Sequence, residues 1–545
     1  MQSPLVKDLS ERYAELKRRR SVWDDQFDEI QRFVRPNVPI FRGRELTKGK
    51  RRHDEVFDGT APWALEQFAA GLSSYLTSST DRWFTLGFEG IPSTELPFEL
   101  IRYLEQVSDI IYHVYALSDS SHAPAMHETY LDIGGFGAGV LYQKRGKDVP
   151  IQFRSFPLSD CFIDENADGL IDVCFRRLQM TTRQLIQAWP KSANDEKVSK
   201  AKDHEIWEVV HANFPRVDRE PKSLGPRGKK FASIYFCETL DEVLEDGGSD
   251  QFLYHIPRWT KMSGEIYGRS PIMTVIPDIK MVNQMSKEVI YSAQLANRPP
   301  MVFEDDSMLY PVKSITPGSI MYRQQGSEMP QPLLSGMQPQ FAYELLSERR
   351  EQIRRALYID FLLRPKKNER QTTVEIMDDR SEMLRQMAPM LGRLQVELLN
   401  PMVERSFIIL SDLGLLPEPP AVAAEFDNIP LEIAYISPAA KAQFGTKVAA
   451  MQQYIQDVAA LAQFDPTAVQ TLEVPELLGE MAKLRDVSPK VLKDPRRLKE
   501  MQEEQKQQEA MAQAAQAAPA MSGAIKDIAQ ARQADPTLVQ DALGG

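Results

Sequence analysis

The sequence has few cysteines and no long hydrophobic run, and both shortages limit what the protein can be. Its 545 residues include three cysteines, Cys161, Cys174 and Cys237. An odd number without a CxxC spacing favours neither a disulfide framework nor a structural zinc site, and it fits a reducing compartment. No window approaches the roughly 18 consecutive apolar residues of a membrane-spanning helix, and the N-terminus has no apolar signal core. We therefore expect a soluble, cytoplasmically made protein with no membrane partner.

Motifs for catalysis and cofactor binding are missing or incomplete. The seven histidines form no HExxH motif, and no Ser-His-Asp or Cys-His set can be singled out. The glycines of 135–139 follow a predicted helix and precede a strand, whereas a phosphate-binding loop must open a helix. The segment 264–270 imitates a short Walker A loop without its lysine. We predict no catalytic residue, no cofactor and no enzymatic activity.

One acidic segment imitates a calcium-binding loop. Residues 164–172 place oxygen ligands at positions 1, 3, 5 and 9 of an EF-hand pattern, with glycine at position 6. Position 12 is Phe175 instead of a bidentate glutamate, and the flanking segments have strand patterns where helices should stand. Asp, Asn and Gly also favour tight turns. We expect a hairpin turn here and no metal.

Length and charge set limits on the fold and on the partners. A chain of this length exceeds one compact core, and roughly two to four domains are expected. The content of 42% hydrophobic and 26% charged residues is typical of a globular protein. The net charge of -12 argues against a protein that coats nucleic acid, because tight phosphate binding normally needs a cationic surface. An acidic protein can still surround DNA without gripping it.

The first half of the chain predicts an α+β fold. Apolar residues recur at three- and four-residue intervals from Leu5 to about Phe33, which predicts an amphipathic helix that ends before Pro36. Further helices are expected at 60–82, 97–117, 122–133 and 181–189. A strand is expected around Trp83, and strand patterns then follow at 140–144, 151–156, 161–164, 170–178, 232–240 and 251–256.

Two charge-rich helices flank a segment that is punctuated by proline. The first is predicted from Asp278 to Asn297, where the following Arg-Pro-Pro stops it because proline lacks the amide that a helix needs. The second spans about Gln338 to Asp360. Between them, apolar and polar residues alternate with Pro and Gly at the turns, which favours short strands. We expect a helical hairpin that carries a small β tip.

The chain after the hairpin begins with a basic segment and is otherwise predicted to be helical. Residues 364–370 hold four cations against one carboxylate and too few apolar side chains to be buried. Thr372 and Glu375 form a capping box that predicts the start of a long helix, which Pro389 and Pro401 should kink or split. The residues from 498 onward are of low complexity, rich in Gln, Ala and Glu.

Several segments are similar to the portal, or head-to-tail connector, proteins of short-tailed bacteriophages. They are FDGTAPWALEQFAAGLSSYLTSSTDRWFTL (57–86), EIYGRSP (265–271), TTVEIMDDRSEMLRQMAPMLGRLQVELLNPMVERSFIILSDLG (372–414) and IAYISPAAKAQ (433–443). The resemblance covers most of the chain. It implies a ring of roughly twelve identical subunits at one capsid vertex, with cyclic symmetry and head-to-tail interfaces. Double-stranded DNA is expected to pass along the ring axis during packaging and ejection, through contacts to phosphate that are independent of sequence.

The resemblance also implies partners and a location. The expected partners are the terminase packaging motor, the major capsid and scaffolding proteins, and tail adaptor or nozzle proteins. The expected location is the portal vertex of the virion, and the host cytoplasm during assembly. The implied portal fold divides the chain into a wing (1–276), a first stem helix (277–298), a clip (299–337), a second stem helix (338–362), a tunnel loop (363–372), a kinked helix that returns through the wing (373–430) and a helical crown with a C-terminal tail (431–545).

Two groups of site residues follow from this division. Arg364, Lys366, Lys367 and Arg370 are assigned to the tunnel loop that meets DNA, with a solvated turn as the alternative. Glu304, Asp305 and Asp306 of the clip are expected to dock partner proteins.

Two other functions stay open. A motor ATPase or nuclease of the packaging machinery would need a P-loop or clustered metal-binding carboxylates. An internal scaffold or minor structural protein of the virion would use the charged helices as a coiled-coil rod.

Overall fold

The computed structural model describes residues 3–38, 41, 54–91, 96–221, 223, 225–304, 316–323, 326, 339–362, 387–426, 431–435, 450–458, 477 and 481. The chain falls into two compact units. The larger comprises Met1–Ser93 and Tyr103–Ala439, and the smaller comprises Thr94–Arg102 and Ala440–Gly545. In the smaller unit, residues 450–458 are helical. None of the described helices is long and apolar enough to cross a membrane.

The N-terminal part of the chain contains the four helices that the sequence predicts. They are α1 (Pro4–Phe33), α2 (Thr60–Leu76), α3 (Phe98–Ala116) and α4 (His122–Phe136). The prediction for α2 ran to residue 82, whereas the helix ends at Leu76. The hydroxyl of Ser78 accepts hydrogen bonds from the amides of Thr80 and Asp81, and this local bonding competes with the helix.

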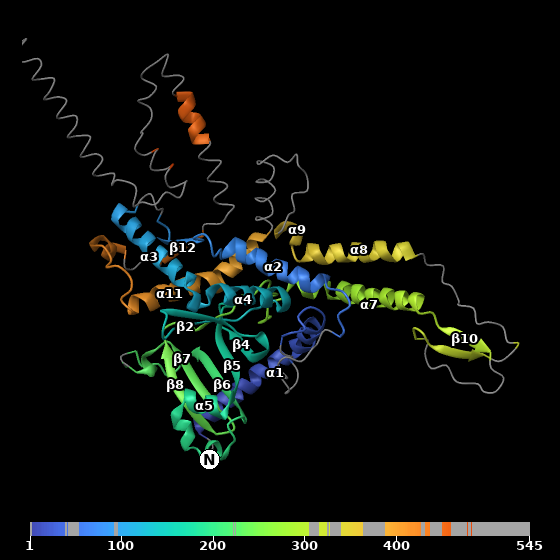
Figure 1. The fold of residues 1–545 in the computed structure, drawn as a ribbon. Coiled ribbons are helices and arrows are strands. Elements are labelled where there is room, and N and C mark those ends of the chain that lie inside the picture. Colours follow the sequence, from blue (N-terminus) through green and yellow to red (C-terminus); the bar gives the residue numbers. More distant parts are fainter. Residues whose placement is uncertain are drawn as a thin grey trace, which may run out of the picture. The chain divides into compact units, whose positions relative to one another are not determined.

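Two antiparallel sheets follow. The five-stranded sheet has the order β4 (Cys161–Glu165), β5 (Ile171–Thr181), β6 (Ile206–Pro215), β7 (Phe231–Cys237), β8 (Glu242–Ser249), and the three-stranded sheet has the order β3 (Ile151–Ser155), β2 (Leu141–Arg145), β9 (Tyr254–His255). Helices α5 (Thr182–Ala188) and α6 (Glu196–Lys200) connect β5 to β6. The apolar face of α1 packs on the five-stranded sheet through Leu9, Tyr13 and Leu16 (Figure 1).

The predicted strands are confirmed, but β6 and β8 were missed. Strand β8 contains Asp246, Gly247 and Gly248, which have low strand propensity, and it forms because β7 pairs with it along its whole length. The hairpin turn predicted at 164–172 is also confirmed. Asn166 accepts hydrogen bonds from the amides of Asp168 and Leu170, and Gly169 adopts a φ of 78°.

The helical hairpin is present, with different bounds from those predicted. Helix α7 runs from Pro271 to Asn297, so the predicted start at Asp278 was wrong. Ser270 caps the true start with its hydroxyl on the amide of Met273, and Pro271 occupies the first turn. Pro277 lies inside the helix, whose early turns are held by burial of apolar side chains such as Ile272 and Ile279.

The second arm of the hairpin is split. Helix α8 spans Pro339–Ala356 and α9 spans Ile359–Leu362, whereas one helix to Asp360 was expected. Tyr358 separates them with a φ of 57°, a left-handed conformation that side chains other than glycine rarely adopt. The ring of Tyr358 lies 5.9 Å from that of Trp259 at this break.

The tip and the returning helix complete the larger unit. Strands β10 (Met301–Glu304) and β11 (Ile320–Arg323) confirm the expected β tip, and they pair in parallel. Residues 387–394 are helical, a π-helical turn follows at Gln395–Leu399, and α11 (Asn400–Asp412) continues. Pro401 has no amide for the carbonyl of Glu397, which accounts for the predicted irregularity. Strand β12 (Leu431–Tyr435) pairs with β1 (Phe84–Phe88), so the prediction that the chain after the hairpin is helical was wrong here. The segment is a strand because β1, which is far away in the sequence, supplies its backbone partners.

Candidate functional site: the helical hairpin and its anchors

The arginines of the second arm of the hairpin lie close to carboxylates of the same chain. Each of the four arginines of α8 has a carboxylate nearby: Arg349 lies 3.3 Å from Asp278 and Arg350 lies 2.6 Å from Asp58. Arg354 and Arg355 lie 3.8 and 3.5 Å from Glu351. This arm therefore presents alternating charges and not an unbalanced cationic stripe.

The loop before α2 anchors both arms of the hairpin. Asn283 of α7 accepts hydrogen bonds from the amides of Phe57 and Asp58 and donates one to the carbonyl of Glu55. Arg350 of α8 donates two hydrogen bonds, of 2.9 and 2.6 Å, to Asp58. Burial by itself raises the pKa of Asp58, but the hydrogen bonds from Thr60 and Arg350 outweigh burial and lower it. Sequence patterns gave no signal for Asn283, because its partners lie more than two hundred residues away.

Two glycines from distant segments, Gly137 and Gly268, meet next to the start of α7. Gly137 ends α4 with a φ of 83°, and its carbonyl accepts the amide of Trp259 at 2.9 Å. A side-chain carbon at either Gly137 or Gly268 would lie well under 3.0 Å from the carbonyl oxygen of the other glycine. The glycines of 135–139 thus end a helix and admit a neighbouring backbone, which agrees with the helix-to-strand order read from the sequence.

A buried arginine ties three distant segments together beside this contact. Arg258 is fully buried and donates to Glu397 at 2.7 Å, to Glu165 at 2.8 Å and to the carbonyl of Gly169 at 2.6 Å. Lys261 adds a 2.6 Å bond to Glu165. Burial by itself raises the pKa of Glu165, but its hydrogen bonds to Lys261 and Arg258 outweigh burial and lower it. The network joins the β4–β5 turn to the π-helical turn, and sequence analysis missed it.

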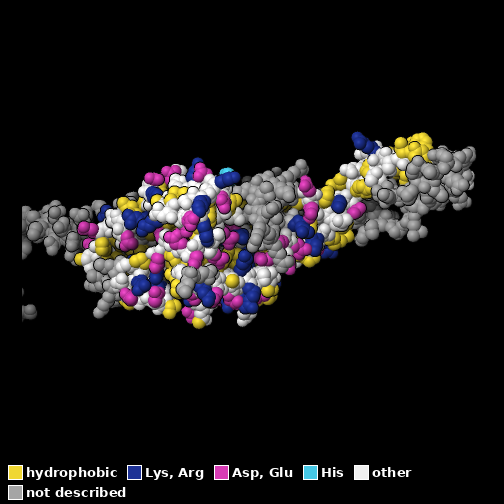
Figure 2. Space-filling view, turned by 90° about the horizontal axis from the view of Figure 1, so that it is seen from below, with side chains coloured by type: hydrophobic (Ala, Val, Ile, Leu, Met, Phe, Trp, Pro, Cys, Tyr) yellow, Lys and Arg dark blue, Asp and Glu magenta, His cyan; other side chains and the backbone are white. Residues whose placement is uncertain are grey.

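The β tip exposes one apolar face. In the parallel register, Met301 lies opposite Ile320 and Phe303 lies opposite Tyr322, so all four side chains share one face. Each is between 47% and 58% exposed, and the two rings lie 6.4 Å apart. Figure 2 shows hydrophobic side chains gathered at the far end of the hairpin.

The predicted site residues lie at or beyond the limits of this region. Glu304 is the last residue of β10 and lies opposite Arg323 in the register. Asp305, Asp306 and all four cations of the predicted tunnel loop, Arg364, Lys366, Lys367 and Arg370, lie outside the described residues, as does the predicted capping box at Thr372. Within the described residues, no group of three or more His, Cys, Asp and Glu is arranged to hold a metal.

Comparison with known proteins gives consistent matches. A family model described as "Bacteriophage head to tail connecting protein" matches residues 6–492. The chain is 27% identical to a "Portal protein" of Salmonella phage epsilon15 over 561 aligned positions, which cover 98% of each chain. It is 24% identical to a "Probable portal protein" of Bordetella phage BPP-1 over 500 positions, which cover 89% of this chain and 88% of the relative.

Solved structures give a weaker likeness. The "Neck of empty GTA particle computed with C6 symmetry" matches 74% of this chain and 90% of its own, with 11% identity and a TM-score of 0.33. The "Neck of native GTA particle computed with C12 symmetry" matches 72% and 89%, with the same identity and TM-score. A TM-score of 0.33 does not establish a shared fold.

Proposed function

The chain belongs to the family of bacteriophage head to tail connecting proteins and has a portal connector role in the virion, and from this premise we propose how it works. We propose that roughly twelve copies form a ring at one capsid vertex and that the ring is the conduit for double-stranded DNA during packaging and ejection. The match of the family model over residues 6–492 carries this proposal.

The hairpin suits the stem of such a ring. Helix α7 has 27 residues and at 1.5 Å per residue is about 40 Å long. The hairpin is held to the rest of the larger unit by Asn283 of α7 and Arg350 of α8. Met281 and Ile290 of α7 and Tyr343 of α8 are exposed. In a head-to-tail ring, exposed apolar side chains of this kind would be covered by the neighbouring subunit. The proposed wing is then 1–270, because the first stem helix begins at Pro271.

The charge balance of α8 suits a channel through which DNA slides. Paired arginines bind phosphate weakly, since each already has a carboxylate partner and release of counterions drives phosphate binding. The cations of the tunnel loop, Arg364, Lys366, Lys367 and Arg370, are proposed to make the transient phosphate contacts. Such contacts are independent of sequence and weaken steeply with salt.

The β tip suits the clip that faces partner proteins. Its exposed face offers an apolar surface, and among the described residues its two short strands pair only with each other, which leaves edges for a neighbouring chain. Glu304 is the last residue of β10, and Asp305 and Asp306 follow it in the sequence. We propose that these three acidic residues dock the terminase motor or a tail adaptor. Contacts of the wing with capsid and scaffolding proteins, and assembly in the host cytoplasm, belong to the same proposal.

Electron microscopy of the purified full-length chain tests the ring. We expect negatively stained particles with a central hole and cyclic symmetry. Rods would favour an internal scaffold, and monomers at micromolar concentration in several salts would contradict the portal ring. An ATPase assay on the same particles tests the packaging enzyme: turnover abolished by a substitution in this chain would contradict a purely structural connector.

A further inference from the structure

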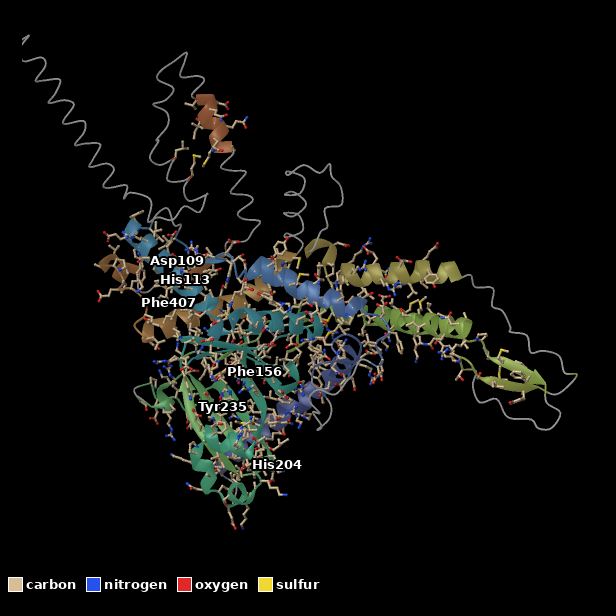
Figure 3. The ribbon with its side chains drawn as sticks, viewed as in Figure 1. Asp109, His113, Phe156, His204, Tyr235 and Phe407 are labelled. Atoms are coloured by element: carbon tan, nitrogen blue, oxygen red, sulfur yellow. The ribbon has the colours of Figure 1, made fainter. Side chains whose placement is uncertain are left out.

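The two sheets of the larger unit meet through aromatic side chains, and a buried arginine lies among them. Arg176 of β5 is 5% exposed, and its guanidinium carbon lies 3.8 Å from the ring centre of Phe156 and 5.4 Å from that of Tyr142. Figure 3 labels Phe156, which follows β3, and Tyr235, which lies on β7 of the five-stranded sheet. Rings on the face of a guanidinium leave its edge, where the donors lie, for acceptors.

Arg176 lacks those acceptors in the described part of the chain. Its Nε is enclosed and has no hydrogen-bond partner, and its guanidinium forms no ion pair there. Arg258, which is equally large and buried, has two carboxylates and two carbonyls. A buried charge without a partner is unfavourable, and aromatic contacts offset only part of that penalty.

The neighbours of Arg176 add positive charge. Arg154 of β3 lies opposite Tyr142 in the register, and Lys144 lies on the same face of β2 as Tyr142. Burial lowers the pKa of Lys144, and the nearby cations Arg154, Lys147 and Arg176 lower it further. The charges of this face are therefore not balanced within the described residues, in a protein whose net charge is -12.

We propose that Lys144, Arg154 and Arg176 form a docking site, the β2 cation site, for an acidic segment of a partner protein. Its carboxylates would supply the missing counter-charges, with one of them bidentate on Arg176. Arg176 keeps 5% of its surface exposed, and the proposal requires a flexible Glu or Asp side chain to approach it there. The phosphates of a rigid DNA duplex lie on a wide cylinder, which would meet Arg154 at the surface and leave Arg176 unpaired.

A labelled acidic peptide provides the probe. Fluorescence anisotropy of a peptide of about eight glutamates, measured with the purified full-length chain at about 150 mM salt, should show saturable binding. Changing both cations, Lys144→Gln with Arg154→Gln, should weaken binding at least about tenfold, since charge-assisted hydrogen bonds are lost. Arg145→Gln is the matched control: Arg145 is exposed and adjacent in sequence, but it points to the opposite face of β2. It should change the affinity by less than about twofold.

Arg176→Met separates docking from a purely structural role. If the counter-charge of Arg176 comes from a bound partner, Arg176 is unpaired in the free protein. The apolar variant should then keep or raise the midpoint of thermal unfolding and lose peptide binding. A lowered midpoint together with unchanged binding would overturn the proposal.

Three further outcomes would also overturn it. The first is equal affinity of the peptide for the wild type and the double variant. The second is a duplex of about 20 base pairs that loses binding in the same variants, which would make the site a nucleic-acid contact. The third is complete loss of peptide binding when rings form, which would assign the site to a second copy of this chain. Binding to the monomer and to the ring is measured separately. If no rings form, the proposed ring fails, but binding to the monomer still tests the docking site.

Discussion

Arg258 and Arg176 are both buried, but different kinds of groups surround their guanidinium groups. Arg258 is held by Glu165, Glu397 and backbone carbonyls, which satisfy its charge inside the chain. Arg176 is held by rings and faces other cations. The first arrangement is closed and fixes segments that are far apart in sequence. The second has no counter-charge among the described residues, and we propose that a partner supplies it. Stability should therefore respond oppositely when each arginine is removed.

The largest effect is expected for Arg258→Met. The substitution leaves Glu165 and Glu397 without their main counter-charge, and breaking a buried pair costs about 3–5 kcal/mol. Chemical denaturation should show this loss in the free energy of unfolding. The same change at Arg176 is the matched control, and it should cost nothing or stabilise. Equal destabilisation by both substitutions would remove the distinction between the two sites.

Gly137→Ala tests how much the close backbone contact between Gly137 and Gly268 contributes to stability. The new side-chain carbon would meet the carbonyl of Gly268, and the φ of 83° already disfavours alanine. We expect a loss of about 2 kcal/mol or more in unfolding free energy. Gly264→Ala is the control, because Gly264 has a similar φ of 82° and open space around it. A loss no larger than that of the control would show that the close approach itself is unimportant.

Asp58→Asn weakens the anchor of the hairpin, a second closed arrangement. The loss of charge-assisted hydrogen bonds from Arg350 should cost about 1–3 kcal/mol at neutral pH. The folded pKa of Asp58 lies below its usual value of 3.8, so this stabilisation is present above about pH 4 and is lost as the pH falls through the folded value. Unfolding free energies of the wild type and the variant should therefore converge in acid. A constant difference down to pH 2 would contradict the ionic role of Asp58.

The smallest effect concerns Tyr358, whose ring lies 5.9 Å from that of Trp259, the residue after Arg258. Both Tyr358→Gly and Tyr358→Ala remove the contact with Trp259, but only glycine accepts the φ of 57° without strain. The glycine variant should therefore be about 1 kcal/mol more stable than the alanine variant in thermal unfolding. An alanine variant of equal stability would mean that the left-handed break between α8 and α9 straightens when the ring is removed.

Sequence patterns predicted the elements whose signals are local. Apolar spacing located α1 and α4, the Asp-Asn-Gly composition located the β4–β5 turn, and alternation between two charged helices located the β tip. The family resemblance also came from contiguous segments, which is why a family model finds it over residues 6–492. The start of α7 was misplaced because a proline usually ends or opens a helix, whereas burial of its apolar face keeps Pro277 inside this one.

The sequence by itself thus determined most of the helices and strands of the first half, the presence of the hairpin and the family, but not β6, β8 or β12. Tertiary structure decided what each charge does. Glu397 lies 139 residues from Arg258, and Asp58 lies 292 residues from Arg350, so no local spacing could pair them. The same holds for the parallel pairing of β10 with β11 and for the cations around Arg176. Local propensity acts over a few residues, whereas the balance of a buried charge depends on every segment that folding brings next to it.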